Sequence, residues 1–229
     1  MLFSGSGNDG RLRLIVGAGG HGRECIGLWR RSLSAHGMNV DSEGWVRQFV
    51  DDRPPDEDVL ARLGATWIGT LEQAIQNSQS SVEYLLGIGS GNVRSAMAAV
   101  IPGLWQPAIA VDPKASIDDD LLMGEGALIF AQATVTTNVE LGRHTHIGRG
   151  AAIGHDCVIG DFVTVMPLAS VSGNVTLGDR ATIGAGAVIR QGQVIGADAY
   201  VGAGAVVVKD VPPGVTVVGN PARPIRSNM

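Results

Sequence analysis

The chain has 229 residues, a mass of 23.7 kDa and a formal net charge of −5 at pH 7. This charge provides no basic field for a phosphate backbone, and no apolar run reaches the roughly 18 residues of a membrane-spanning helix. The opening segment lacks the basic and apolar regions of a secretory signal, and the two cysteines, Cys25 and Cys157, have no metal or disulfide spacing. We therefore predict a cytoplasmic protein with no nucleic-acid partner and no membrane partner.

The composition changes along the chain, which indicates two domains. All four tryptophans precede residue 106, and the stretch 117–207 contains none. Glycine accounts for 33 residues, about twice the ordinary share of roughly 7%. We predict a first domain of residues 1–110 and a second domain of residues 111–229.

The first domain opens with a strand, a glycine-rich loop and a helix. Residues 11–16 (RLRLIV) predict the strand and residues 23–33 (RECIGLWRRSL) predict the helix. Between them, Gly17, Gly19 and Gly22 match G-x-G-x-x-G, a pattern in which backbone amides at a helix N-terminus hold phosphate. A second strand (WVRQFVDD), a helix (TLEQAIQ) and a third strand (YLLGIGS) follow, so we predict a small α/β, Rossmann-like domain.

A six-residue repeat runs through the second domain. From Ile117 to Val207, every sixth residue is aliphatic, which gives sixteen positions, often followed by glycine. A mostly small residue stands two places before each, so the pair faces the same side of a short strand. Such strands bury their apolar face by stacking, and three hexads per coil predict an all-β parallel β-helix of about five coils. A β-sandwich is the alternative, but its period-two alternation is absent.

The motifs of the two domains together resemble a known family. The stretches GHDCVIGD (154–161), VSGNVTLGD (171–179) and VGAGAVVVKDVPPGVTVVGNPAR (201–223) follow the opening LIVGAGGHGRE (14–24). This order is similar to that of the bacterial left-handed β-helix sugar O- and N-acyltransferases. The family includes sialic acid O-acetyltransferases and UDP-4-amino-sugar N-acetyltransferases, and the resemblance covers nearly the whole chain.

The resemblance implies both an activity and an assembly. The activity is acetyl transfer from acetyl-CoA, a co-substrate, to an amino or hydroxyl group of a nucleotide-linked sugar, a UDP- or GDP-amino sugar, in bacterial glycan synthesis. No permanently bound cofactor is expected, and the subunits are expected to form a homotrimer. The alternatives are a sialic-acid-type O-acetyltransferase, a NAD-binding oxidoreductase and an inactive β-helix scaffold. The oxidoreductase is disfavoured because roughly 100 residues precede the repeat, too few for two mononucleotide-binding halves and a catalytic domain.

Among five histidines, His155 is the candidate general base. It follows Ile153 by two residues, at a corner of its coil and outside the inward-facing positions. A neutral imidazole is suited to take the proton of an attacking amine or hydroxyl. By resemblance, the histidine of the HDC motif is that base and Asp156 raises its basicity. Gly173 lies one full predicted coil after His155, where its backbone amide can stabilise an oxyanion.

The resemblance also assigns ligand contacts in each domain. The predicted nucleotide-sugar contacts are Gly19, Gly20, His21, Asp51, Asp52 and Gly69. The predicted acetyl-CoA contacts are Gly173, Thr164, Ala185, Ala203, Lys209 and Arg223. A solvated turn is the alternative for the two aspartates, and a cover over the last coil is the alternative for the C-terminal tail.

Three positions depart from the family's pattern. Many members have a second histidine at the position of Thr164, where it contacts the acetyl donor, and an asparagine at the position of Gly148. Relatives commonly have histidine at the position of Asp112. These departures are compatible with the acetyl-transfer chemistry and do not identify the acceptor.

Three further features of the repeat receive structural interpretations. His144 and His146 suggest zinc, but Asp156 is the one obvious additional ligand, so we interpret them as solvated outward side chains and predict no metal site. Cys157 falls on a small inward position, which predicts a structural role. The outward threonines are predicted to form an uncharged wall suited to packing against another subunit. They are Thr134, Thr136, Thr176 and Thr182.

Overall fold

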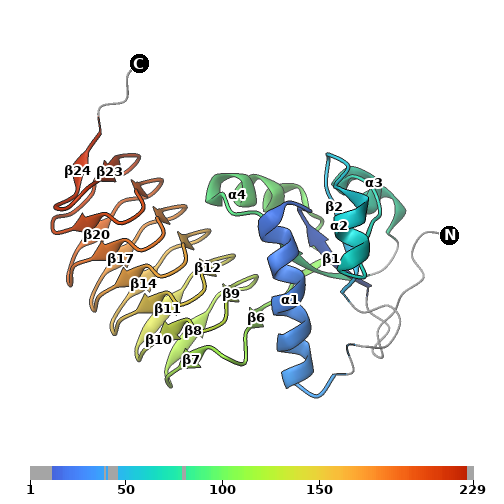
Figure 1. Ribbon diagram of the computed structural model, residues 1–229, viewed down its shortest axis with the longest axis horizontal. Helices are drawn as coiled ribbons and strands as arrows, with labels where there is room; N and C mark the ends of the chain where they lie inside the picture. The colour runs from blue at the N-terminus through green and yellow to red at the C-terminus, as the bar shows by residue number, and fades with distance from the viewer. Residues whose placement is uncertain (1–11, 39, 41–45, 79–80, 226–229) are drawn as a thin grey trace. The chain divides into compact units, whose positions relative to one another are not determined.

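The computed structural model describes residues 12–38, 40, 46–78 and 81–225, and the chain divides into two compact units (Figure 1). The first unit extends to Gly89 and resumes at Ala96–Pro113, and the second comprises Ser90–Ser95 and the residues from Lys114 onward. This grouping differs from the division predicted at residue 110 because a short segment of the first half packs with the repeat. No helix among the described residues is long and apolar enough to cross a bilayer.

A five-stranded parallel sheet with the strand order β3-β2-β1-β4-β5 forms the first unit. Its strands are β1 (Leu12–Val16), β2 (Gln48–Val50), β3 (Thr66–Trp67), β4 (Val82–Leu86) and β5 (Gln106–Pro107), and β6 (Ala110–Val111) follows them. Its helices are α1 (Gly20–Ala35), α2 (Glu57–Arg62) and α3 (Leu71–Asn77), with α4 (Gly91–Val100) continuing from the second unit into the first. The predicted strand–loop–helix opening is confirmed, whereas α2 and α4 were not predicted. Residue 11 and residue 45, at the ends of two predicted strands, lie outside the described residues.

The glycine-rich turn between β1 and α1 depends on close backbone packing. Gly17 has φ of +99°, a conformation that side chains disfavour, and its amide donates to the carbonyl of Val50 at 2.8 Å. A Cβ on Gly22 would overlap the carbonyl oxygen of Gly17, so only glycine fits there. By contrast, a Cβ on Gly19 or Gly20 would meet no atom within 4 Å. The exposed side of the turn is therefore the side that a ligand can approach.

The second unit is a parallel β-helix built from sixteen strands of two or three residues. They are β7 (Ser116–Ile117), β8 (Leu121–Met123), β9 (Leu128–Ile129), β10 (Thr134–Val135), β11 (Val139–Leu141), β12 (His146–Ile147), β13 (Ala152–Ile153), β14 (Val158–Ile159), β15 (Thr164–Val165), β16 (Ser170–Val171), β17 (Thr176–Leu177), β18 (Thr182–Ile183), β19 (Val188–Ile189), β20 (Val194–Ile195), β21 (Tyr200–Val201) and β22 (Val206–Val207). After them, β23 (Thr216–Val218) pairs with β21, and β24 (Arg223–Pro224) pairs with β23.

Consecutive strands lie on three faces of each coil, so every strand pairs with the equivalent strand of the next coil. The β7 face contains β7, β10, β13, β16, β19 and β22, and the β8 face contains β8, β11, β14, β17 and β20. The β9 face contains β9, β12, β15, β18 and β21, with β23 and β24 at its end. Figure 1 shows these strands stacked in parallel rows. The predicted coil of three hexads is thus confirmed by the register, for example Val135 beside Ile153 and Ile153 beside Val171.

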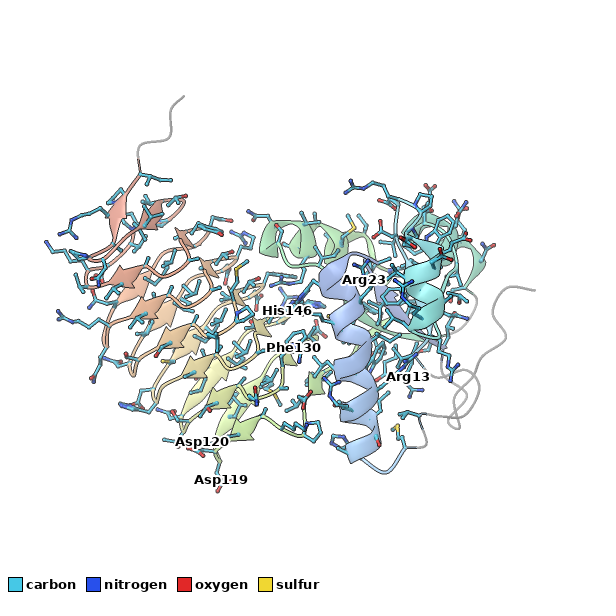
Figure 2. All side chains as sticks on the ribbon, viewed as in Figure 1. Arg13, Arg23, Asp119, Asp120, Phe130 and His146 are labelled. Carbon is cyan, nitrogen blue, oxygen red and sulfur yellow. The ribbon has the colours of Figure 1, made fainter. Side chains whose placement is uncertain are left out.

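The interior of the β-helix is filled by the predicted aliphatic and small residues. Each of the sixteen aliphatic positions ends a strand or lies in one, and those from Ile129 onward are buried. The small partners, such as Ala151 and Ala169, are buried as well. Some outward side chains are also buried, notably Phe130 and His146 (Figure 2). An outward position in the repeat is therefore not always an exposed one.

The outward threonines do not form the single wall that the sequence predicted. Thr134 lies on the β7 face, Thr176 on the β8 face and Thr182 on the β9 face. The prediction was wrong because it treated outward positions as one surface, whereas the coil distributes successive hexads over three faces. A homotrimer therefore needs a different argument.

Arg94 anchors the first turn of α4 to the β-helix within the second unit. Its side chain is fully buried, and its guanidinium donates to the carbonyl oxygens of His144, Phe162 and Val163 at 2.7–3.1 Å. It also donates to the Thr164 hydroxyl at 3.0 Å. A buried guanidinium satisfied by several fixed acceptors is costly to truncate, because the acceptors lose their donor without gaining water.

We expect the substitution Arg94→Met to lower the free energy of unfolding by about 3 kcal/mol, because buried carbonyl oxygens lose a charged donor. Arg190→Met, which changes an exposed arginine of the same β-helix, should change it by less than about 0.5 kcal/mol. Denaturant unfolding followed by far-UV circular dichroism measures both. Equal midpoints for the two variants would show that Arg94 does not anchor the fold.

Candidate active site

His155 and Asp156 form a hydrogen-bonded pair at one edge of the β-helix. The chain passes there from β13 on the β7 face to β14 on the β8 face, and we call this the His155 edge. The Nδ1 atom of His155 and Oδ2 of Asp156 are 2.6 Å apart, and the two side chains are 54% and 50% exposed. The predicted base thus faces solvent, with a carboxylate directly beside one ring nitrogen.

The ionisation of Asp156 defines the roles of the two ring nitrogens. The hydrogen bond from His155 and a second one from Asn138 hold the pKa of Asp156 below its ordinary value. The carboxylate is therefore ionised at neutral pH and can act only as an acceptor. His155 must then donate from Nδ1, which leaves the lone pair of Nε2 in the neutral ring available to accept a proton.

Gly173 lies directly against the free nitrogen of His155. A Cβ built on Gly173 would come within 2.5 Å of His155 Nε2, so the ring occupies the space that any other residue would fill. Among the hydrogen bonds of the described residues, none uses the Gly173 amide as a donor. The structure therefore brings together the predicted base and the predicted oxyanion donor, as their separation by one coil indicated.

Cys157 follows this pair and is a core residue. Its side chain is buried, and its thiol donates to the carbonyl oxygen of Ser172 at 3.2 Å. Burial raises the pKa of the thiol above its ordinary value, which disfavours the reactive thiolate. The structural interpretation of Cys157 is confirmed.

His144 and His146 are buried, which corrects the prediction that they are solvated. They are 3% and 1% exposed, and the His144 ring stacks on Phe162 at a centroid distance of 5.2 Å. Burial, together with the charges of Arg94 and Arg143, lowers the pKa of His144 to about 4. The prediction failed because the repeat shows which residues point outward but not which parts of the chain cover them. Within the described ranges, no group of three or more potential ligands is arranged to hold a metal ion.

The departures from the family's pattern have local structural explanations. Thr164 is buried on the β9 face, where its hydroxyl accepts a hydrogen bond from Arg94. This geometry gives no support to a contact between Thr164 and acetyl-CoA. Asp112 is fully buried and accepts from Arg31 on α1 at 2.7 Å, which explains an acid at that position. A Cβ on Gly148 would approach the backbone of the next coil to 2.8 Å, so an asparagine would require a local shift.

The predicted acetyl-CoA contacts lie on two different edges. Gly173 and Lys209 follow β16 and β22, which places them on the His155 edge at intervals of whole coils. Ala185 and Ala203 follow β18 and β21 and lie where the chain passes from the β9 face to the β7 face, which we call the Ala185 edge. Arg223 is exposed on β24. One β-helix therefore does not assemble all of these residues at a single edge.

The predicted nucleotide contacts in the first unit lie around the glycine-rich turn. Gly19 precedes α1 with an extended backbone, and neither a side-chain cap nor an acidic residue occupies the first turn. Gly20 is exposed and His21 is half-buried at the same helix end. Amides at the start of a 16-residue helix attract anions, so this turn is suited to a phosphate group.

Asp51 and Asp52 have different roles, although the sequence predicted the same role for both. The Asp51 carboxylate accepts from the amides of Ala18 at 2.7 Å and Arg53 at 3.0 Å, so it braces the glycine-rich turn. The Asp51 amide in turn donates to the carbonyl of Gly69, the buried glycine that precedes α3. Asp52 is exposed, so it is the one of the two that remains a candidate for a ligand contact.

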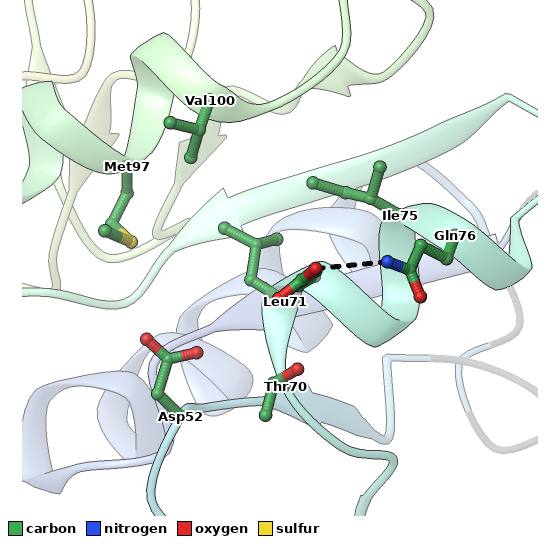
Figure 3. A pocket seen from close by; sticks show the side chains of 8 residues that line it. Asp52, Thr70, Leu71, Ile75, Gln76, Met97 and Val100 are labelled. Carbon is green, nitrogen blue, oxygen red and sulfur yellow. Dashed lines mark hydrogen bonds between the residues drawn. The ribbon is translucent and has the colours of Figure 1, made fainter.

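A cavity of about 620 Å³ adjoins Asp52 in the first unit (Figure 3). Apolar side chains of α3 and α4 form much of its wall, including Leu71, Ile75 and Met97. Glu72, which accepts from Gln76 at 3.1 Å, adds a second carboxylate. Two carboxylates and no cation line the cavity, so it is suited to an uncharged group with apolar surface and not to a diphosphate.

Two residues of the second unit were missed by the sequence analysis. Asn138 donates from Nδ2 to Oδ1 of Asp156 at 2.6 Å, and Arg94 binds Thr164. The separation of Asn138 and Asp156 by one coil was available as a signal, because the repeat stacks such positions. No pattern in the sequence pointed to Arg94, which reaches the repeat from outside it.

Two family profiles match the chain. "PglD N-terminal domain" matches residues 14–101, and "Bacterial transferase hexapeptide (six repeats)" matches residues 156–191. A comparison with curated proteins gave no match.

Solved structures resemble the chain over almost its whole length. WeeI from Acinetobacter baumannii is 31% identical, with a TM-score of 0.81, over 94% of this chain and 100% of that one. The acetyltransferase domain of PglB from Neisseria gonorrhoeae, solved with acetyl coenzyme A, is 29% identical, with a TM-score of 0.79 over the same shares. A mutant of perosamine N-acetyltransferase from Caulobacter crescentus, solved with CoA and GDP-perosamine, is 27% identical, with a TM-score of 0.79, over 94% of this chain and 97% of that one.

The geometry predicts the tautomer of His155. At alkaline pH the neutral ring should carry its proton on Nδ1, because Asp156 accepts from that nitrogen. Long-range ¹H–¹⁵N correlation spectra distinguish the two tautomers. The preference should weaken in Asp156→Ala, and a ring protonated mainly on Nε2 in the unmodified protein would contradict the assignment.

Proposed function

Because the chain belongs to the left-handed β-helix sugar acyltransferases, we propose that it transfers an acetyl group from acetyl-CoA to the amino group of a nucleotide-linked sugar. The observation that carries this proposal is the arrangement of His155, whose Nδ1 is held by Asp156 while Nε2 lies against Gly173. The named relatives include an N-acetyltransferase solved with CoA and a GDP-sugar, and a domain solved with acetyl coenzyme A. Membership of an enzyme family removes the oxidoreductase and the inactive scaffold as alternatives.

In the proposed reaction, His155 acts as the general base. The neutral amine of the sugar attacks the thioester carbonyl, and Nε2 takes the proton that the nitrogen loses as the tetrahedral intermediate forms. The Gly173 amide stabilises the oxyanion. The carbon–sulfur bond then breaks, and the imidazolium returns the proton to the leaving thiolate of coenzyme A. Asp156 stabilises the imidazolium between these two steps.

We assign the nucleotide of the acceptor to the first unit. The amides around Gly19 and Gly20 bind the diphosphate, because they lie at the exposed start of α1. The nucleobase enters the cavity beside Asp52. The lining of this cavity is apolar and acidic. His21 and Gly69 complete the proposed contacts, whereas Asp51 supports the turn.

The positions of the predicted acetyl-CoA contacts favour a homotrimer. Gly173 and Lys209 lie on the His155 edge, whereas Ala185 and Ala203 lie on the Ala185 edge. A groove between neighbouring subunits places one edge of each kind side by side, so the pantetheine of acetyl-CoA contacts both. Arg223 and Lys209 supply cations for its phosphates. The cytoplasmic location stays a prediction.

Turnover of acetyl-CoA against a panel of UDP- and GDP-amino sugars, with free sialic acid as an O-acetylation control, tests the proposed function. We expect thiol release with at least one nucleotide-linked amino sugar and formation of an amide product detected by mass spectrometry. Turnover with free sialic acid alone would establish the O-acetyltransferase alternative. Absence of turnover across a panel that also includes dTDP-amino sugars would contradict the proposal.

The substitution His155→Ala should lower kcat by roughly 10² to 10⁴, the usual contribution of a general base. The melting temperature should hardly change, because the side chain is 54% exposed. Asp156→Asn should lower kcat by less, because the His155 ring loses its orientation but keeps its basic nitrogen. A kcat unchanged by His155→Ala, under conditions where chemistry limits the rate, would exclude His155 as the base.

The substitution Gly20→Leu should raise KM for the nucleotide sugar by about tenfold or more and leave acetyl-CoA affinity unchanged. A Cβ at Gly20 would meet no atom within 4 Å, so we expect the added side chain to block the ligand without straining the turn. Gly103→Leu is the matched control, because that glycine is equally open and lies beyond the far end of α4. Ala203→Asp, at an exposed position, should weaken acetyl-CoA binding alone. Calorimetric titration with each substrate decides whether the two units divide the substrates in this way.

A further inference from the structure

Asn138 occupies a column of corner residues on the His155 edge. Asp120, Asn138, Asp156 and Asn174 hold the same place in successive coils, and all have positive φ, between 53° and 68°. Asp120 projects outward at the start of the column (Figure 2). Asparagine and aspartate tolerate this left-handed conformation better than most residues. Their backbone alone therefore accounts for their residue type, and any further role requires a side-chain contact.

Asn138 makes such a contact. Its amide Nδ2 lies 2.6 Å from Oδ1 of Asp156, while Oδ2 of the same carboxylate accepts from His155 Nδ1, also at 2.6 Å. Both carboxylate oxygens of Asp156 therefore accept a hydrogen bond. Oδ1 accepts from Asn138 on the coil below, and Oδ2 accepts from the neighbouring imidazole. Asn174, one coil above, is not among the side-chain donors to Asp156 in the described part of the chain, although its backbone amide donates to the His155 carbonyl at 2.7 Å.

We infer that Asn138 is a positioning residue that fixes the Asp156 carboxylate against His155 Nδ1 and so aims Nε2 at the acceptor amine. This inference rests on the proposed function.

The exposure of the pair is the physical reason that Asp156 needs a second partner. The Asp156 side chain is 50% exposed, and one hydrogen bond leaves it free to rotate about its Cα–Cβ bond. In water, an exposed ion pair with one contact contributes little, because both side chains lose rotamer freedom to form it. Asn138 is itself exposed, but its hydrogen bond from the coil below gives the same carboxylate a second contact, which narrows the rotamers that Asp156 presents to His155.

The charged and polar groups around Asp156 support the same arrangement. His155 and Asn138 are the two hydrogen-bond donors that lower the pKa of Asp156, and the buried Cys157 thiol follows it in the chain. Asn138 therefore adds to the stability of the ionised form that His155 requires. Three side chains thus form a hydrogen-bonded series, in which Asn138 orients Asp156 and Asp156 orients His155.

The substitution Asn138→Gly tests this role, because glycine accepts the positive φ while removing the amide. Asn174→Gly is the matched control, with the same residue type, the same conformation and the same column. We expect Asn138→Gly to lower kcat roughly tenfold, with KM for both substrates unchanged, and Asn174→Gly to leave kcat unchanged. The isosteric variant Asn138→Asp, which replaces the donor by an acceptor, should lower kcat at least as much.

A double-mutant cycle separates positioning from a general structural effect. If Asn138 acts through Asp156, the roughly tenfold effect of Asn138→Gly should disappear in an Asp156→Gly background. Titration of the Asp156 carboxyl by ¹³C NMR should show a higher pKa in Asn138→Gly than in wild type, and no change in Asn174→Gly. Equal kcat values for the two asparagine variants, or an undiminished Asn138 effect without Asp156, would overturn the inference.

The single substitutions also distinguish this inference from the proposed function. If His155→Ala keeps wild-type kcat, the general base is wrong and the proposed mechanism fails with it. If His155→Ala and Asp156→Gly both lower kcat while Asn138→Gly does not, only the positioning role of Asn138 fails.

Discussion

Closure of each coil after three hexads is the constraint on which the second unit depends. A large and a small side chain from each hexad fill the interior, and the backbone of every strand pairs with the equivalent strand of the next coil. Since a strand contributes only two or three residues, there is little room for functional groups on the strands themselves. Chemistry is therefore placed at the corners, where equivalent positions of successive coils lie one above another. The contact of His155 with Gly173 and that of Asn138 with Asp156 both follow from this register.

The same constraint selects the residue types that the candidate site uses. A corner that turns sharply requires one residue with positive φ, and short polar side chains accept this conformation more readily than aliphatic ones. At the His155 edge, this requirement places Asn138 and Asp156 in one column. Folding and chemistry therefore favour the same residues at this edge. Substitutions to glycine at these positions keep the fold's requirement and remove the chemical group, which separates the two contributions.

The sequence predicted the regular parts of the structure and missed the contacts that cross the regular pattern. The aliphatic repeat predicted the coil, its register and the position of His155 over Gly173, because all of these depend on local spacing. It did not predict the burial of His144 and His146, because the repeat shows which side chains point outward and not what packs against them, such as the Phe162 ring on His144. Arg94 comes from a helix that the sequence analysis did not identify, and its partners are 50 to 70 residues away. In the first unit, Asp51 and Asp52 look equivalent in sequence, and only the hydrogen bond from Ala18 shows that one of them supports the turn.

The exposure of the His155–Asp156 pair links its chemistry to assembly. In a single chain both side chains are about half exposed, and water screens the attraction between the carboxylate and an imidazolium. A general base in such a site gains little from its acid partner until water is excluded. In the proposed homotrimer, substrate and a neighbouring subunit would cover the His155 edge, lower the local dielectric and strengthen the same hydrogen bond. In this arrangement the fixed geometry comes from the stacked coils of one chain, whereas the electrostatic effect of that geometry depends on what covers the edge.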